Sequence, residues 1–329
     1  VAQLTAGLPV PRIGWLDGLA GAILAFLLCV AAVLLLLRPK FLRPSVRAGL
    51  AMGVVSLTSL AVISTLGVAL WHTVRIPKNW SIAACDVGQG DAFAIRAPDA
   101  LGSVHYALID TGQTQEKMRE CVHRLGIARF DFVVLTHWDR DHIGGVDAVL
   151  ALTSNLLVIH PGDDAEGLVL SAVSRPGTIV EFAHAGMAGR LGNATWQVLW
   201  PDQRTPSMQT GNSGSIAMLW SIDGITLATL ADLGAQAQDT LAAHIIDLPR
   251  VDVLKVAHHG SADTSQALTQ KLHPKVALIG VGANNGYGHP TRSALNALEV
   301  IGTQIERTDR NGMVVVAREQ DRIVVYTDR

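Results

Sequence analysis

A pair of long apolar runs, each without a single charge, constrains this chain more than any other feature. The first covers residues 18–37 and the second residues 48–71. A helix of about 20 apolar residues crosses a hydrocarbon core of about 30 Å. A buried core helix is the alternative, but core helices are rarely uncharged over such a length. We therefore predict two transmembrane helices, over about residues 16–37 and 48–71.

The charges between these runs predict how the chain is oriented in a membrane. Arg38, Lys40, Arg43 and Arg47 stand there with no acid among them. Short loops rich in Lys and Arg stay in the cytoplasm, so the residues after about 72 are expected outside it. A cleaved signal peptide fits less well, because its basic residues precede the apolar run. The chain starts without Met, and we expect it to be the C-terminal part of a longer protein.

Near residue 80 the sequence changes to short apolar runs separated by Gly, Asp and Asn. We predict that residues 1–79 form the membrane segment with its linker and that residues 80–329 form one α/β domain. Runs at 80–87, 91–97 and 105–112 follow one another too closely for crossover helices, which favours antiparallel pairing. Later runs alternate with helical patterns. Two mixed sheets packed face to face, with helices outside, explain this order.

Cysteine content and charge limit the function classes. Cys29 falls in the first apolar run, whereas Cys85 and Cys121 could pair in an oxidising compartment. With only three cysteines we interpret them as buried thiols. The net charge of −2 offers no broad basic surface for nucleic acid, and 5% aromatic residues give no sign of a stacking platform.

Polar clusters follow the predicted strands where these end. They are Asp110, the segment 137–142, Asp232, the pair His258 and His259, and His289. Side chains on loops at one edge of a rigid scaffold often converge in sheet-based enzymes. The pattern predicts a single site.

The densest cluster, "HWDRDH", holds four metal-capable side chains: His137, Asp139, Asp141 and His142. Imidazole and carboxylate groups suit zinc, iron or manganese. A capped turn that opens the next helix is the alternative, and it explains one aspartate but not both histidines.

This motif resembles the His-x-His-x-Asp-His signature of metallo-β-lactamase-fold hydrolases, with Asp139 in place of the second histidine. "DVGQGD" (86–91), "LIDTG" (108–112), "LKVAHHGS" (254–261) and "YGHP" (287–290) together resemble the C-terminal domain of ComEC-type DNA internalisation proteins. The resemblance implies a metallo-β-lactamase fold, an αββα sandwich of two mixed sheets, preceded by the two transmembrane helices.

The resemblance also implies a set of ligands for two divalent ions. His137 and Asp139 would bind the first ion, Asp141, His142 and one histidine of "AHHGS" the second, and Asp232 both. We favour His258 as that ligand because it directly continues the strand. The superfamily's third histidine has no clear counterpart besides His184 or His160. Because the first site has few imidazole ligands, its metal preference shifts from zinc towards manganese or magnesium. We expect Mn or Zn, with Mg as a further option.

Other residues are assigned around these ions. Catalytic roles fall to Asp141, to His259, and to His289 as a proton donor. We expect Asp91 and Asp110 to support the ligands, and Asn212 and Ser215 to bind substrate phosphate. Ordinary turn chemistry is the alternative for each of these loops. "DVGQGD" lacks the spacing of a nucleotide-binding fingerprint.

The resemblance implies a metal-dependent phosphodiesterase or nuclease acting in DNA uptake during natural transformation. It would degrade the strand that is not transported, on the outer side of a bacterial cytoplasmic membrane. DNA, the membrane and the rest of the channel protein would be its partners. A membrane-anchored hydrolase of a small ester, lactone or phosphodiester is one alternative, and a non-catalytic domain that guides DNA is another.

Overall fold

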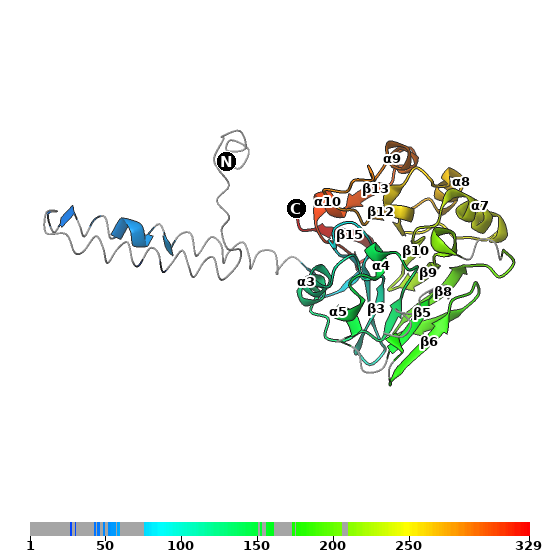
Figure 1. Cartoon of the computed structure of the whole chain (residues 1–329), viewed down its shortest axis with the longest axis horizontal. Coiled ribbons are helices and arrows are strands. Elements are labelled where there is room, and N and C mark those ends of the chain that lie inside the picture. Colours follow the sequence, from blue (N-terminus) through cyan, green and yellow to red (C-terminus); the bar gives the residue numbers. More distant parts are fainter. Residues whose placement is uncertain are drawn as a thin grey trace. The chain divides into compact units, whose positions relative to one another are not determined.

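The computed structural model in Figure 1 describes residues 76–150, 152, 156–160, 173–174, 176–205 and 210–329, with short stretches between residues 27 and 59. The chain divides into two compact units, Val1–Val74 and Arg75–Arg329. Among the described residues no helix is both long and apolar enough to cross a bilayer. The predicted spans at 16–37 and 48–71 fall mostly outside the described residues.

The second unit is built on two mixed sheets, as the sequence predicts. The first sheet has the order β15-β14-β1-β2-β3-β4-β5-β6. Its strands are β1 (Trp80–Ala84), β2 (Phe93–Pro98), β3 (Val104–Ile109), β4 (Phe132–Val134), β5 (Leu156–His160), β6 (Thr178–Phe182), β14 (Val314–Glu319) and β15 (Arg322–Thr327). The pairs β1–β2 and β2–β3 are antiparallel, which confirms the prediction from their close spacing.

The second sheet has the order β13-β12-β11-β10-β9-β8-β7. Its strands are β7 (Ala188–Leu191), β8 (Ala194–Trp200), β9 (Ala217–Ile222), β10 (Ile225–Thr229), β11 (Val253–Lys255), β12 (Val276–Ile279) and β13 (Gln304–Arg307). Strands β10 to β13 run parallel, and β7 to β10 pair antiparallel.

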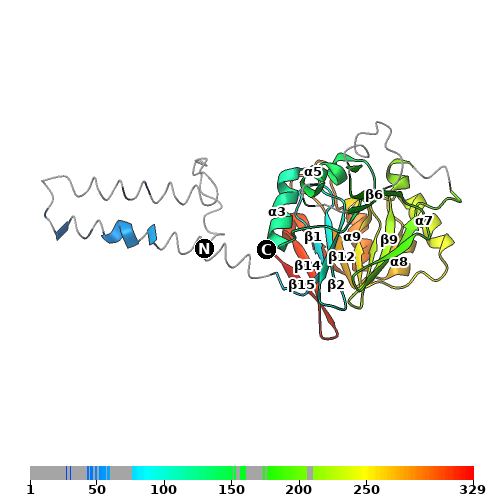
Figure 2. The same ribbon diagram turned by 90° about the horizontal axis from the view of Figure 1, so that it is seen from below.

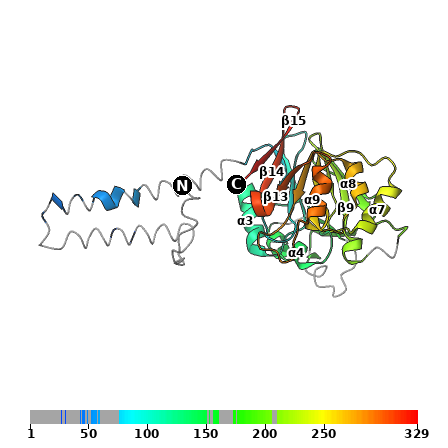
Figure 3. The same cartoon turned by 90° about the horizontal axis from the view of Figure 1, so that it is seen from above.

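Helices cover the outer faces of both sheets. The helices are α3 (Gln115–Leu125), α4 (Arg140–Ile143), α5 (Val146–Leu150), α7 (Ala235–His244), α8 (Gln266–Leu272), α9 (Arg292–Glu299) and α10 (Thr308–Asn311). Figure 2 shows α3 and α5 beside the first sheet and α7 and α8 beside the second. Figure 3 shows α9 on the same side as α7 and α8. The result is the predicted αββα sandwich.

The core between the sheets is aromatic. Phe132 of β4 stacks on Trp196 of β8, with ring centroids 4.9 Å apart, and meets Trp220 of β9 edge-on at 5.8 Å. All three side chains are buried. Contacts of this kind add to the free energy of burying the rings, so they hold the two sheets face to face.

Helix α3 illustrates how the outer layers form. The Thr114 side chain accepts a hydrogen bond from the Lys117 N–H at its start, and Gly126 ends it in the left-handed conformation. Its apolar face buries Met118 and Cys121 against the first sheet.

Cys121 forms a disulfide with Cys85, their Cα atoms being 5.8 Å apart. The interpretation of these two residues as buried thiols is therefore wrong. The sequence shows how many cysteines there are, but not that the segment after β1 and helix α3 bring these two together.

Candidate metal centre

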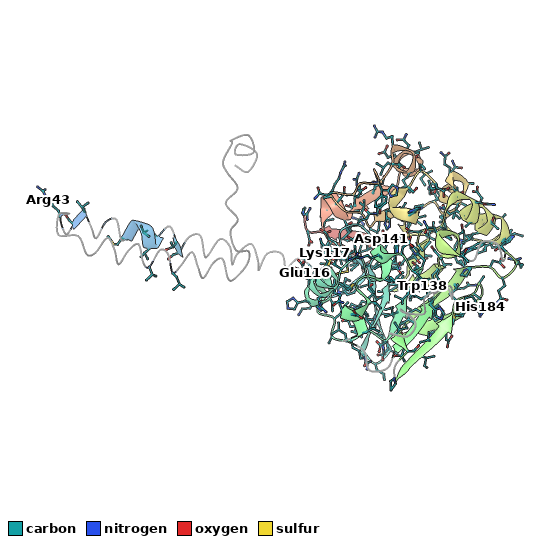
Figure 4. All side chains as sticks on the ribbon, viewed as in Figure 1. Arg43, Glu116, Lys117, Trp138, Asp141 and His184 are labelled. Carbon is teal, nitrogen blue, oxygen red and sulfur yellow. A yellow bond between two sulfur atoms is a disulfide. The ribbon has the colours of Figure 1, made fainter. Side chains whose placement is uncertain are left out.

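The strand ends converge because of the parallel pairing. Strands β3 and β4 are parallel neighbours in the first sheet, and β10, β11 and β12 are parallel neighbours in the second. The carboxyl ends of parallel strands lie at one edge of a sheet. The loops that follow them carry the polar clusters, and Figure 4 labels Asp141 among these loops.

The centre of the site is one carboxylate oxygen, Oδ2 of Asp232. The Nε2 atoms of His142 and His259 each lie 3.4 Å from it, and that of His137 lies 3.9 Å away. All four side chains are buried. Imidazoles that aim their nitrogens at a shared carboxylate form the donor set typical of a divalent metal.

The spacing of these atoms fits a metal ion. Ligand atoms at about 2.1 Å from a tetrahedral ion lie about 3.4 Å from one another. The Nε2 atoms of His142 and His259 are 3.4 Å apart, and His259 Nε2 is 3.3 Å from Asp141 Oδ2. Two imidazole nitrogens face each other here, an arrangement that a cation between them stabilises. His142, His259, Asp141 and Asp232 could therefore hold one ion.

A second group of donors lies beside the first. His137 Nε2 is buried and has no hydrogen-bond partner among the described residues. It lies 3.6 Å from Oδ2 of Asp139, which is 61% exposed. Leaving a buried ring nitrogen unpaired costs free energy. This nitrogen is therefore suited to coordinate a metal ion taken up from solution. His137, Asp139 and Asp232 could hold another ion.

The protonation behaviour of the ligands shows that the site attracts positive charge. Burial lowers the pKa of His142, but the carboxylates of Asp232 and Asp110 outweigh burial and raise it to about 10. Burial raises the pKa of Asp141, yet its hydrogen bond with His259 and the charge of His142 bring it down to about 2. A divalent ion would supply the same positive charge and displace the imidazole protons.

Asp110 orients the His142 ring from behind. Its Oδ2 lies 2.8 Å from His142 Nδ1, on the side of the ring away from Asp232. The backbone N–H and the hydroxyl of Thr136 both donate to the same carboxylate. Carboxylates in this position fix a ligating imidazole and increase its basicity. The arrangement supports the role predicted for Asp110.

Asp91 is held by a residue that the sequence analysis missed. The Lys255 ammonium contacts the Asp91 carboxylate, lies 3.4 Å from Asp232 Oδ1 and donates to the Ala231 carbonyl. Burial lowers the pKa of Lys255, but the carboxylates of Asp91 and Asp232 outweigh burial and raise it. One atom each of Asp91, His142, Asp232 and His259 lies within 4.8 Å of the others; the contact with Lys255 leads us to assign Asp91 to the ammonium.

The geometry reverses the preference between the two adjacent histidines. His259 is buried and aims its Nε2 at His142, Asp141 and Asp232, while its Nδ1 lies 2.8 Å from the Gly280 carbonyl. The side chain of His258 is 29% exposed, with Nε2 3.8 Å from Asp232 Oδ2. We therefore favour His259 as the ligand and His258 for the side of the site that faces solvent.

Backbone strain marks the same loops. Seven non-glycine residues of the described part of the chain have positive φ, and four of them are Asp110, Ala231, His258 and His259. Such conformations cost about 1–3 kcal/mol each and persist where the surrounding structure enforces them. Because His258 has a left-handed conformation, the chain does not extend the strand through it. The argument that favoured His258 as the ligand, direct continuation of the strand, therefore does not hold.

Neither stand-in for a third histidine joins the centre. His160 packs its ring near Trp138 and Phe182, at 5.9 and 6.1 Å. His184 has its Nδ1 3.2 Å from the Ala185 carbonyl, and Figure 4 shows it well apart from Asp141.

The loop of Asn212 and Ser215 does reach the second group of donors, at His137. The Ile216 N–H donates to the carbonyl of Thr136, the residue before His137. Ser215 is fully buried, and its hydroxyl has no hydrogen-bond partner among the described residues. Asn212 belongs to a 3-10 turn (η2, Gly211–Gly214) and remains partly exposed. Ser215 is thus placed near His137, whereas among the described residues no contact of the Asn212 side chain supports its predicted role.

His289 lies on the outer side of the histidine cluster. Its ring is 5.5 Å from that of His258 and 6.5 Å from that of His259. Burial and the neighbouring His258 lower its pKa, and burial also lowers the pKa of His258. Both shifts favour the neutral ring, which has one N–H donor and one nitrogen that can accept a proton.

Comparison with known sequences decides the family. The model of the Metallo-beta-lactamase superfamily matches residues 85–282, which is more than half of the chain. The chain belongs to the metallo-beta-lactamase superfamily. The matched segment contains every donor described above and ends before His289.

Relatives of this chain include competence proteins. ComE operon protein 3 of Bacillus subtilis is 31% identical over 252 residues, which are 70% of this chain and 32% of that protein. Competence protein ComA of Neisseria gonorrhoeae is 25% identical over 295 residues, 88% of this chain and 38% of that protein. The chain thus spans about a third of the length of these relatives.

Among solved structures, the metallo-beta-lactamase fold protein YhfI of Bacillus subtilis is similar, with a TM-score of 0.48 and 10% identity. The likeness covers 70% of this chain and 98% of YhfI.

Proposed function

We propose that this chain is the metal-dependent phosphodiesterase part of a membrane DNA-uptake protein, and that it degrades the strand that is not transported. The observation that carries the proposal is the convergence of three buried imidazoles on Asp232 Oδ2, with Asp139 and Asp141 beside the Nε2 atoms of His137 and His259. The likeness to competence proteins supports DNA as the substrate.

Two divalent ions, Mn²⁺ or Zn²⁺ and with Mg²⁺ as a further option, suit this donor set. His142, His259 and Asp141 would hold one, His137 and Asp139 the other, and Asp232 would contact both. Bound at such a centre, divalent ions supply the positive charge that stabilises the oxygens of a phosphodiester displacement.

The residues of the chain perform the remaining tasks. Asp110 and the Gly280 carbonyl hold the His142 and His259 rings from behind, so that their Nε2 atoms keep facing Asp232. The Lys255 ammonium offsets the charge of Asp91, whose carboxylate lies 3.5 Å from His259 Nδ1 and 3.8 Å from His142 Nδ1. His289, on the open side, is placed to donate a hydrogen bond from its ring N–H to a substrate phosphate oxygen.

The disulfide supports the predicted side of the membrane. Disulfides persist in oxidising compartments and are rare in the cytoplasm. A domain with Cys85 bonded to Cys121 is therefore suited to the extracytoplasmic side of a bacterial cytoplasmic membrane, as the basic loop at residues 38–47 predicts.

Hydrolysis of labelled single- and double-stranded DNA tests the proposal. The full chain in detergent would be stripped with a chelator and then supplied with Mn²⁺, Mg²⁺ or Zn²⁺. We expect cleavage only with metal, none in Asp141→Ala, and full activity in Asp247→Ala, which alters an exposed carboxylate. Absence of cleavage, together with hydrolysis of a small ester, would instead indicate a small-molecule hydrolase.

A further inference from the structure

Three aromatic side chains lead from solvent to the metal centre. Tyr287 stacks on His289, with centroids 5.8 Å apart and planes at 27°. The His289 ring meets that of His258 at 5.5 Å, and His258 Nε2 lies 3.8 Å from Asp232 Oδ2. We call Tyr287, His289 and His258 the aromatic ledge.

The loop that carries the ledge is fixed by its own hydrogen bonds. The Asn285 side chain donates to the carbonyls of Gly282 and His289 and accepts from the His289 N–H. The Thr291 N–H donates to the Gly260 carbonyl. A Cβ atom at Gly260 would lie 2.5 Å from Pro290, so the loop packs directly against the turn of His258. The loop therefore holds Tyr287 in place.

The exposure of Tyr287 is unusual within this chain. The side chain is 72% exposed. The other two tyrosines are partly buried, Tyr106 beside Trp80 and Tyr326 with its hydroxyl on Glu319. Nothing in the described residues covers the outer face of Tyr287. An exposed aromatic ring beside a reactive centre is suited to bind a flat, apolar group.

We propose that the aromatic ledge is a nucleobase-binding subsite, which stacks a base of a single strand while the adjoining phosphodiester lies at the metal centre. The proposal rests on the proposed function. Every base has a π-face, so stacking on aromatic side chains is tolerant of sequence. In a duplex the neighbouring bases cover both faces, and only an unpaired or frayed nucleotide can stack. The ledge thus predicts a preference for single strands without strong base selectivity.

A double-mutant cycle between protein and substrate tests the ledge. The full chain in detergent would be titrated with fluorescein-labelled single strands that have uncleavable phosphorothioate linkages. The strands would be intact or would carry abasic sites. Tyr287→Ala should weaken binding of the intact strand by about tenfold or more, the range of one lost base stack. Tyr287→Phe keeps the aromatic ring, so its affinity for the intact strand should stay within about twofold of wild type. That change is far smaller than the loss expected when one base stack is removed.

The abasic strand separates stacking from indirect effects. It should bind wild type and Tyr287→Ala equally, and Ile246→Ala, which alters an exposed apolar side chain far along the chain, should change neither strand. Equal losses for both strands, no loss at all, or no single-strand binding by the wild type would overturn the ledge. If DNA is cleaved equally well by wild type and Tyr287→Ala, the nuclease proposal holds and the ledge proposal does not. If binding depends on the base but no metal supports cleavage, the ledge proposal holds and the nuclease proposal does not.

Discussion

At the scale of single residues, Lys255 organises the acidic side of the centre. It lies in the mostly apolar segment "VDVLKV". A lysine in a strand that is expected to be buried was the feature of the sequence that could have indicated its role. The candidate ligands in "HWDRDH" and at Asp232 could be proposed from the sequence, because closely spaced imidazoles and carboxylates have few structural uses. It could not distinguish His258 from His259, because the direction of each side chain depends on two consecutive left-handed residues.

Removing the ammonium alone should be costly. Lys255→Met leaves the buried Asp91 carboxylate without its partner, and breaking a buried ion pair destabilises a protein by about 3–5 kcal/mol. We expect the free energy of unfolding in denaturant to fall by that amount. The double variant Lys255→Met, Asp91→Asn should recover most of the loss. A double variant as unstable as the single one would show that Asp91 and Lys255 are not coupled.

At the scale of elements, glycines bring the loops of the site together. Gly90 has a φ of +120°, and a Cβ atom there would lie 2.0 Å from the Asp141 carbonyl, while the Asp91 N–H donates to that same carbonyl. Gly90 of "DVGQGD" therefore allows close packing against the loop that carries Asp141.

Element order was predictable from the sequence because apolar runs and helical patterns alternate clearly. The loop of the "HWDRDH" motif was less predictable, because α4 begins at Arg140, inside the motif. Edge strands β6, β7 and β13 are hard to predict from the sequence, since β6 and β13 bury few side chains and all three have weak apolar patterns.

Gly90→Ala tests this packing. The substitution combines a strained φ with a clash against backbone, so we expect the protein to lose about 1–3 kcal/mol of stability. Displacement of the Asp141 loop should also weaken Mn²⁺ binding by about 10-fold or more, as for other changes that disturb ligand orientation. Gly286→Ala, where the added atom meets nothing within 4 Å, is the matched control. Calorimetric titration with Mn²⁺ would give both affinities, and equal values would contradict the role of Gly90.

At the scale of the whole molecule, the disulfide and the basic loop both favour an extracytoplasmic domain. The loop charges were readable from the sequence, since topology depends on local Lys and Arg content. The disulfide was not, because pairing depends on the tertiary contact between the segment after β1 and helix α3. Cys29 lies outside the pair.

Thiol counting checks this arrangement. The chain isolated without reductant and then denatured should react with a thiol reagent at one cysteine, Cys29. Reduction should expose all three and lower stability by about 4 kcal/mol, the value expected for a loop of 36 residues. Three reactive thiols before reduction would mean that the domain folds in a reducing compartment.

The most direct test of the metal centre is the binding of Mn²⁺ to the chelator-treated full chain, followed by electron paramagnetic resonance. We expect wild type and the control Asp247→Asn to bind two ions. Asp232→Asn removes the shared ligand and should weaken binding more than about 100-fold, beyond the effect of losing a supporting residue. Unchanged binding in Asp232→Asn, or no binding of Mn²⁺ or Zn²⁺ by the wild type, would contradict a metal centre at Asp232.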